Sequence, residues 1–168
     1  ICINGMNSEE TAYLTMAMAN SGEMADLSGI EGIKIDKHST GGVGDKTTLV
    51  VGPLFAACGL KLAKMSGRGL GLTGGTVDKL ESITGYKLNL TKKQFLEALD
   101  KVGCAVISQS EKIAVADKKI YALRNEIGAV DSIPLIASSI MSKKIASGSD
   151  VIPVELFQML KDDTVKVL

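Results

Sequence analysis

Apolar and polar residues recur along the chain with two different periods, which predicts both helices and strands. Residues 8–20 are apolar on one side of a helix. Asn7 and Glu10 stand three residues apart, the spacing of a capping box, and Gly22 follows as a stop signal. The segment 33–36 instead alternates at every second residue, as a strand does. We therefore expect a helix first and a strand next.

The rest of the chain repeats this change from strand to helix. A helix is expected after residue 46, with a kink or break at Gly52-Pro53 because proline removes a helical N–H. The further expected elements are strands at 62–65 and 104–108 and helices at 76–82, 91–102, 117–126 and 132–146, the last three opened by Thr91 with Gln94, by Asp117 and by Ser132 with Pro134. Strands that alternate with helices predict an α/β fold with a helical segment attached.

Composition and charge narrow the class of protein. The 168 residues are 45% hydrophobic, and their charges cancel to a formal net of +0. This composition supports one core of ordinary size and argues against a disordered chain or a nucleic-acid-binding module. The three cysteines form no CxxC, so neither a disulfide scaffold nor a cysteine-ligated zinc site is expected. No apolar run approaches the about 20 residues of a membrane span. We expect a soluble, cytoplasmic protein without nucleic-acid or membrane partners.

Ten of the 18 glycines lie between Gly41 and Gly75, and most of these belong to two loops. The first loop, KHSTGGVGDK at 37–46, follows a strand and precedes a helix, where exposed N–H groups and the helix dipole favour an anion. Its hydroxyls and the Lys37 ammonium add donors, and its spacing is not that of a P-loop. The alternative is a tight turn with solvated polar residues. We favour a ligand loop, and His38, the single histidine, then stands where a general acid is useful.

The second loop runs from Ser66 to Thr76 and contains GxGxxG at 69–74. That pattern matches a dinucleotide-binding fingerprint, but no convincing acidic residue follows about 20 positions later at a strand end. A nicotinamide dinucleotide is therefore not expected. Two glycine-rich turns that carry hydroxyls fit a single phosphate held from two sides.

A third segment places an apolar side chain, a hydroxyl and a cation on one helix face. In the helix expected at 132–146, Ser139 and Lys143 are four residues apart, with Ile136 one turn earlier. Arg124 on the preceding helix carries a planar guanidinium that can donate two parallel hydrogen bonds to carbonyl acceptors. This set suits a planar heterocycle that gains negative charge on reaction. Alternatively, Lys143 belongs only to a cationic last turn of the helix.

Together these segments resemble the thymidine and pyrimidine-nucleoside phosphorylase family. KHSTGGVGDK, SGRGLGLTGGTVDKLESITG, and YALR followed by VDSIPLIASSIMSKK look like its characteristic stretches, in order and at its spacing, over about residues 8–150. The resemblance implies a pentosyltransferase that cleaves uridine, thymidine or deoxyuridine with inorganic phosphate, in pyrimidine salvage. The products are the free base and a (deoxy)ribose 1-phosphate. It also implies a homodimer, no organic cofactor, and an active site between a helical and an α/β domain.

The resemblance assigns a role to individual residues. His38 would be the acid near the 2-oxo group of the base. The phosphate would be held by Lys37, Ser39, Thr48, Lys64, Met65, Ser66 and Thr76, and the base by Arg124, Ser139 and Lys143 in a pocket lined by Tyr121, Leu70 and Ile136. A structural potassium or calcium ion would be held by the main chain of Gly44 and Lys46. The triplet Lys64-Met65-Ser66 slightly favours the broader pyrimidine-nucleoside enzyme over the strict thymidine enzyme.

The chain departs from the family pattern in three respects. Leu72 stands where the family usually has histidine, which leaves His38 without a second imidazole nearby. The chain is expected to be a fragment that lacks the family's first helices, which help to form the dimer, and its C-terminal half. The expected ranges are pieces of the small helical domain at 1–25 and 114–147, the first βα units of the large domain at 30–113, and a divergent tail at 148–168.

Two other functions stay open at the level of sequence. An anthranilate-type phosphoribosyltransferase shares the general fold, although its Gly-Thr-Gly-Gly-Asp-like loop differs from the Ser-Thr-Gly-Gly found here. Such an enzyme would prefer phosphoribosyl pyrophosphate with magnesium to phosphate with uridine. The other alternative is a non-catalytic remnant of a phosphorylase, whose unpaired strand edges would favour aggregation.

Overall fold

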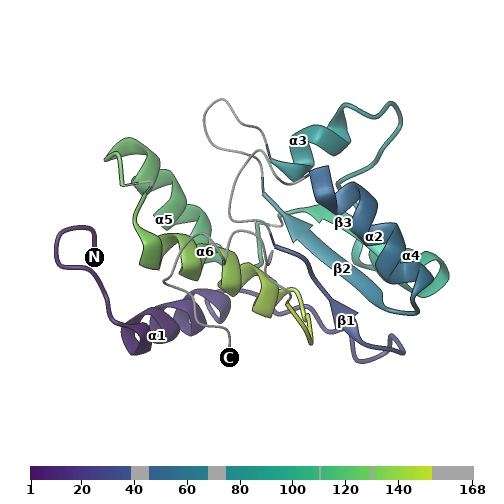
Figure 1. The fold of residues 1–168 in the computed structure, drawn as a ribbon, viewed down its shortest axis with the longest axis horizontal. Helices are drawn as coiled ribbons and strands as arrows, with labels where there is room; N and C mark the ends of the chain where they lie inside the picture. The colour runs from purple at the N-terminus through teal and green to yellow at the C-terminus, as the bar shows by residue number, and fades with distance from the viewer. Residues whose placement is uncertain (39–45, 68–74, 110, 130, 153–168) are drawn as a thin grey trace. The chain divides into compact units, whose positions relative to one another are not determined.

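The computed structural model describes residues 1–38, 46–67, 75–109, 111–129 and 131–152 (Figure 1). The elements follow in the order α1 (Ser8–Ala19), β1 (Lys34–Ile35), α2 (Thr47–Ala57), β2 (Lys61–Ser66), α3 (Thr76–Glu81), α4 (Lys92–Val102), β3 (Cys104–Ser108), α5 (Val115–Glu126) and α6 (Ile133–Ala146). This mixture confirms the α/β class expected from the sequence. Within the described ranges, every helix is too short or too polar to cross a bilayer.

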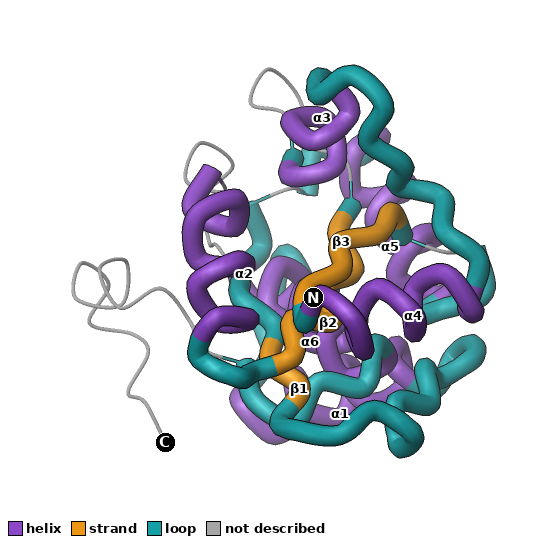
Figure 2. The backbone as a smooth tube through the Cα atoms, turned by 90° about the vertical axis from the view of Figure 1, so that its right-hand side faces the viewer, coloured by secondary structure: helices purple, strands orange, loops and turns teal. Residues whose placement is uncertain are grey.

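The three strands form one parallel sheet in the order β1-β2-β3 (Figure 2). Helices α2 and α4 cover its opposite faces. The apolar cluster on the α4 side consists of Leu27, Ile30, Ala63, Phe95, Leu99 and Ala105. On the other face, Gly52 of α2 approaches β2 so closely that an added Cβ would stand 2.9 Å from Leu62 Cδ2. Both faces of β2 are therefore buried, as is usual for a parallel strand.

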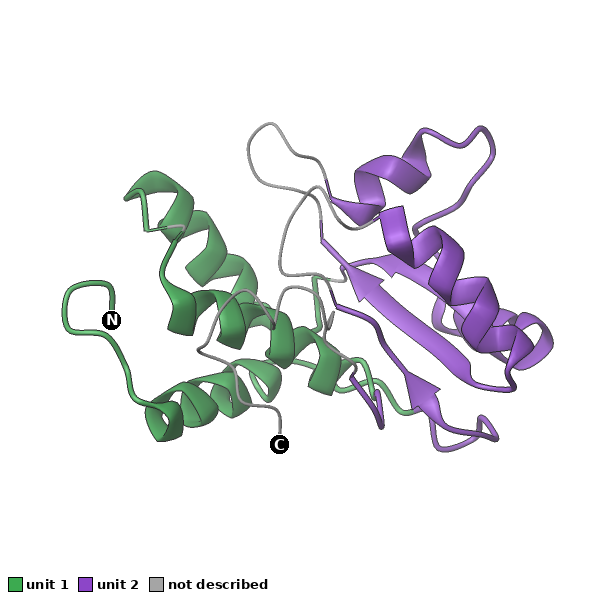
Figure 3. Cartoon of the chain, viewed as in Figure 1, with its two compact units in different colours: residues 1–26, 110–148 green, residues 27–109, 149–168 purple. Residues whose placement is uncertain are grey.

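The chain divides into two compact units (Figure 3). Unit 1 comprises Ile1–Asp26 and Ser110–Gly148 and contains α1, α5 and α6. Unit 2 comprises Leu27–Gln109 and Ser149–Leu168 and contains the sheet with α2, α3 and α4. The sequence-based ranges for family domains, with their limits at residues 25, 30, 113 and 147, stay predictions.

A capping box opens α1 in unit 1, as the sequence predicts. The backbone N–H of Glu10 donates to Asn7 Oδ1 at 2.8 Å, and the backbone N–H of Asn7 donates to Glu10 Oε2 at 2.9 Å. The helix then packs against α6, where Thr15 Oγ1 and Ser138 Oγ lie 3.1 Å apart in a hydrogen bond. Ala19 of α1 and Ala146 of α6 also belong to one buried cluster with Ala114, and such small side chains let helices pack closely.

The capping box predicts a measurable contribution of Asn7 to stability. Asn7→Ala removes the side-chain acceptor of the Glu10 N–H and is expected to lower the free energy of unfolding by about 1 kcal/mol. Urea denaturation followed by circular dichroism measures the change. Ser8→Ala, at the first helical residue, is the control and should leave the midpoint unchanged. Equal losses in the two variants would show that Asn7 does not act as a cap.

The structure corrects two details of the expected helices. Of the kink or break expected at Gly52-Pro53, the break is absent: helix α2 continues from Thr47 to Ala57 with Pro53 inside it, because the proline removes only one N–H and the hydrogen bonds of the neighbouring residues remain. Asp117 does not cap α5. The cap is Ala114, which adopts a left-handed conformation with φ 48°, and Asp117 lies buried in the first turn. The helix thus begins earlier than the acidic residue suggests, and the Asp117 carboxylate is available for another contact.

The outer edge of β1 is paired by the segment that follows unit 1. Ile35 and Val151 form a parallel bridge. The backbone N–H of Asp36 donates to Val151 O at 3.0 Å, and the N–H of Asp150 donates to Lys34 O at 2.8 Å. The first residues of the range 148–168 therefore continue the sheet beyond β1.

Candidate active site

The carboxyl ends of β1 and β2 gather buried lysines and hydroxyls in unit 2. Lys37 follows β1, Lys64 lies in β2, and Thr48 and Thr76 lie in the first turns of α2 and α3. Their exposed fractions are 5%, 3%, 2% and 1%. Ligands of open parallel α/β sheets bind outside the carboxyl ends of the strands. This edge is therefore the natural place for an anion.

The two lysines are held in place by polar partners. The Lys64 ammonium donates to the carbonyl oxygen of Lys37 at 2.6 Å and forms an ion pair with Asp36 Oδ1 at 3.7 Å. The Lys64 and Asp36 side chains are 3% and 0% exposed. The Lys37 ammonium donates to Thr47 Oγ1 at the start of α2. A buried ammonium needs such partners, and here they also fix its position.

The Thr76 hydroxyl has a different status. Its Oγ1 is buried and has no hydrogen-bond partner among the residues that the structure describes. A buried hydroxyl without a partner has lost its hydrogen bonds to water, and no hydrogen bond within the protein replaces them. Such groups are therefore rare. Thr76 therefore fits the position of a ligand-binding donor.

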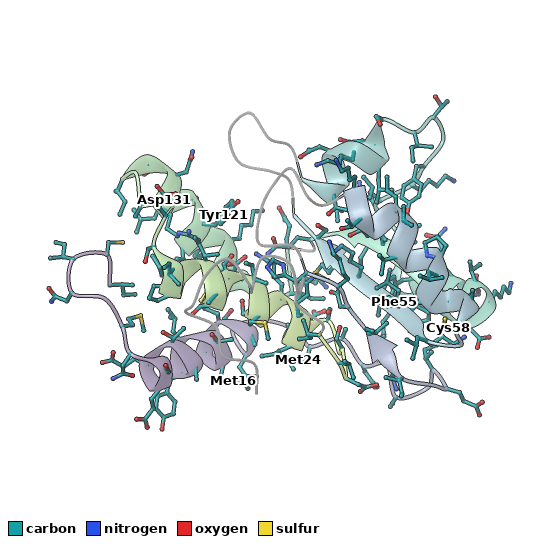
Figure 4. The ribbon with its side chains drawn as sticks, viewed as in Figure 1. Met16, Met24, Phe55, Cys58, Tyr121 and Asp131 are labelled. Atoms are coloured by element: carbon teal, nitrogen blue, oxygen red, sulfur yellow. The ribbon has the colours of Figure 1, made fainter. Side chains whose placement is uncertain are left out.

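A second polar cluster lies in unit 1, where α5 and α6 pack together. The Lys143 ammonium donates to Ser139 Oγ at 2.9 Å, which confirms that the two residues share one face of α6. Lys143 Nζ and Arg124 Cζ each lie 5.7 Å from the centroid of the Tyr121 ring, labelled in Figure 4. Both cations therefore lie within cation–π distance of the same aromatic ring.

Arg124 is held rigidly within this cluster. Its side chain is 4% exposed, and it donates from Nε to Ala129 O at 3.1 Å and from Nη1 to Leu135 O at 3.4 Å. The carbonyl oxygens thus orient the plane of the guanidinium. Burial raises the pKa of the neighbouring Tyr121 phenol, the Arg124 cation opposes this shift, and the Asp117 carboxylate adds to it. The phenol therefore stays protonated at neutral pH.

Comparison with known proteins identifies the family. A model described as glycosyl transferase family, a/b domain, matches residues 31–163. The chain belongs to this glycosyl transferase family. Its match reaches into the range 148–168 that the sequence pattern sets apart as a tail.

Within the glycosyl transferase family, the chain is similar to pyrimidine-nucleoside phosphorylases. The chain is 61% identical over 156 residues to pyrimidine-nucleoside phosphorylases from Geobacillus stearothermophilus and Bacillus subtilis (strain 168). Such an enzyme from Staphylococcus epidermidis (strain ATCC 12228 / FDA PCI 1200) is 60% identical. Each alignment covers 93% of this chain but 36% of the relative, so the chain spans about a third of their length. These relatives confirm the resemblance seen in the sequence and do not favour the phosphoribosyltransferase alternative.

The structure places the remaining residues implied by the resemblance as follows. His38 is half-buried directly after β1, and Ile136 is half-buried in the first turn of α6. Met65 is 3% exposed within β2 and Ser66 ends that strand. Ser39, Gly44, Leu70 and Leu72 lie outside the described residues. The roles of all these residues in binding stay predictions.

Two carboxylates near the lysines were not assigned to the site from the sequence. Asp36 contacts Lys64, and Asp117 Oδ2 accepts a hydrogen bond from Lys143 Nζ at 2.8 Å. One signal was present for Asp117, since it stands seven residues before Arg124 and two helical turns put both on one face of α5. For Asp36, its place directly after a strand of the sheet was the corresponding signal.

The resemblance also implies a structural cation on main-chain oxygens. Of its two positions, Gly44 lies outside the described residues, and Lys46 is the exposed N-cap of α2. Within the described ranges, His, Cys, Asp and Glu do not gather into a group of three or more that could hold a metal ion.

Proposed function

We propose that this chain supplies the phosphate- and base-binding residues of a pyrimidine-nucleoside phosphorylase. The observation that carries the proposal is the cluster in unit 1, in which Arg124 and Lys143 flank the Tyr121 ring beside the Ser139 hydroxyl. Two cations on one aromatic surface suit a pyrimidine that leaves as an anion. The names of the relatives support the same reaction.

The reaction transfers a pentosyl group from the base to phosphate. A phosphate oxygen bonds to the anomeric carbon while the bond from that carbon to N1 of the base breaks, and the bonding electrons go to the base. The sugar carries positive charge in the transition state and the leaving pyrimidine carries negative charge. Arg124 and Lys143 stabilise the base most strongly when it is fully anionic, which lowers the barrier rather than only the energy of bound substrate. His38 donates a proton to the 2-oxo oxygen.

Phosphate is the second substrate in this proposal. Lys37 and Lys64 supply positive charge at the sheet edge, and the buried hydroxyls of Thr48 and Thr76 supply donors. Ser39, Met65 and Ser66 complete the set by resemblance. Thr76 Oγ1, which has no hydrogen-bond partner within the described parts of the chain, supports this assignment, because a phosphate oxygen would give it one.

The wider setting follows from the same resemblance. We propose uridine, thymidine and deoxyuridine as substrates, pyrimidine salvage as the role, and the cytoplasm as the compartment. The longer protein would act as a homodimer, with a potassium or calcium ion near the first loop and no organic cofactor.

An ultraviolet assay for base release tests the proposal. The chain is incubated with uridine or thymidine, with and without phosphate, and circular dichroism on the same sample reports folding. We expect release that depends on phosphate and that His38→Ala abolishes. A folded chain that releases no base would contradict catalysis by this chain and support a non-catalytic remnant. Preference for phosphoribosyl pyrophosphate with magnesium would instead support the transferase alternative.

A further inference from the structure

Asp117 joins α5 to the base-binding cluster through one short contact. Its Oδ2 accepts a hydrogen bond from Lys143 Nζ at 2.8 Å, across 26 residues of sequence. The Asp117 side chain is 2% exposed and the Lys143 side chain 14%. The carboxylate is therefore buried behind the ammonium, which alone of the two reaches solvent appreciably.

The two acceptors around Lys143 determine where its ammonium can point. Nζ carries three protons. One is donated to Asp117 Oδ2 at 2.8 Å and one to Ser139 Oγ at 2.9 Å. One acceptor comes from α5 and the other from α6. The third N–H of Lys143 therefore points in a defined direction, where it can donate to an acceptor on a ligand.

The charges of the cluster explain why the partner is a carboxylate. Lys143 Nζ and Arg124 Cζ both lie over the Tyr121 ring, each 5.7 Å from its centroid. Two cations that lie over one ring repel each other, and the Asp117 carboxylate beside Lys143 reduces this repulsion. Neighbouring Asp117 also contributes to the raised pKa of the Tyr121 phenol, after burial.

We propose that Asp117 is a positioning residue for the pyrimidine. It holds the Lys143 ammonium between α5 and α6 so that the remaining N–H meets the anionic base, and it has no contact with the base itself. This inference rests on the proposed function of Lys143. It predicts that Asp117 matters for the base and not for phosphate, because its carboxylate acts on the base through the Lys143 ammonium.

A double-mutant cycle separates positioning from a merely structural role. Uracil and phosphate binding are measured by calorimetry for the wild type, Asp117→Asn, Lys143→Ala and the double variant. We expect Asp117→Asn to weaken uracil binding by about tenfold and to have no further effect in the Lys143→Ala background. Phosphate binding should not change, and Asp117→Glu should recover part of the uracil affinity. Glu126→Gln removes the same charge from an exposed position of α5 and is the control.

A second measurement does not depend on a ligand. In a sample with ¹⁵N-labelled lysine, the side-chain NMR signal of a hydrogen-bonded Lys143 ammonium should be protected from exchange in the wild type and lost in Asp117→Asn. Additive losses in the cycle, equal losses for phosphate, or an unprotected Lys143 in the wild type would overturn the inference about Asp117. If the folded wild type binds no uracil, the proposed function fails and this inference fails with it. Normal uracil binding by Asp117→Asn would overturn the positioning role alone.

Discussion

Asp36→Ala is expected to lower the free energy of unfolding by about 3–5 kcal/mol, because it leaves a buried ammonium without its counter-charge. The Lys64 and Asp36 side chains are 3% and 0% exposed, and their charged atoms lie 3.7 Å apart. Water cannot replace the carboxylate at this depth. Since folded domains are stable by about 5–15 kcal/mol, such a loss would remove a large part of the free energy of unfolding.

Urea denaturation with circular dichroism measures this loss. Glu97→Gln is the control, because it breaks the solvent-exposed pair with Lys93 on α4, where the charged atoms are 3.9 Å apart. Exposed pairs of this kind contribute little, so the control should keep the wild-type midpoint. The double variant Asp36→Ala with Lys64→Met should recover part of the stability, since it removes both charges. If Asp36→Ala leaves the urea midpoint unchanged, the pair does not contribute to the free energy of unfolding.

Lys143→Ala is expected to raise the barrier to base release by about 2–4 kcal/mol, as for other charged donors that meet a developing anion. Uracil binding should weaken and phosphate binding should not, because the role proposed for Lys143 is to meet the base and the residues proposed for phosphate are others. Steady-state kinetics with uridine and calorimetry with uracil and phosphate measure the three quantities.

Lys119→Ala provides the matched control, because Lys119 is an exposed lysine on α5. It should leave both binding constants and the rate as in the wild type. Lys143→Ala also leaves the Asp117 carboxylate without its ammonium, so circular dichroism must show that the variant is folded. Equal losses of uracil and phosphate affinity would remove Lys143 from the base-binding set.

Local signals in the sequence were sufficient for most helices and strands. Asn7 with Glu10 and Thr91 with Gln94 form the expected capping boxes, because these bonds join residues only three apart. The strand at 104–108 lies where it was expected, and the one expected at 62–65 forms the middle of β2. At Pro53 the helix does not break, because one missing N–H does not outweigh the remaining hydrogen bonds of α2.

The sequence by itself determined the family motifs, the α/β class and the Ser139–Lys143 pair, since these depend on neighbours in the chain or on fixed helical spacing. Only the tertiary structure decided which carboxylate stands behind which lysine. Asp117 looked like a helix cap, yet it is the 2%-exposed partner of a lysine 26 residues away. Burial and pairing of this kind arise when separate helices and strands pack, and a charge inside that packing must find a partner wherever the fold supplies one.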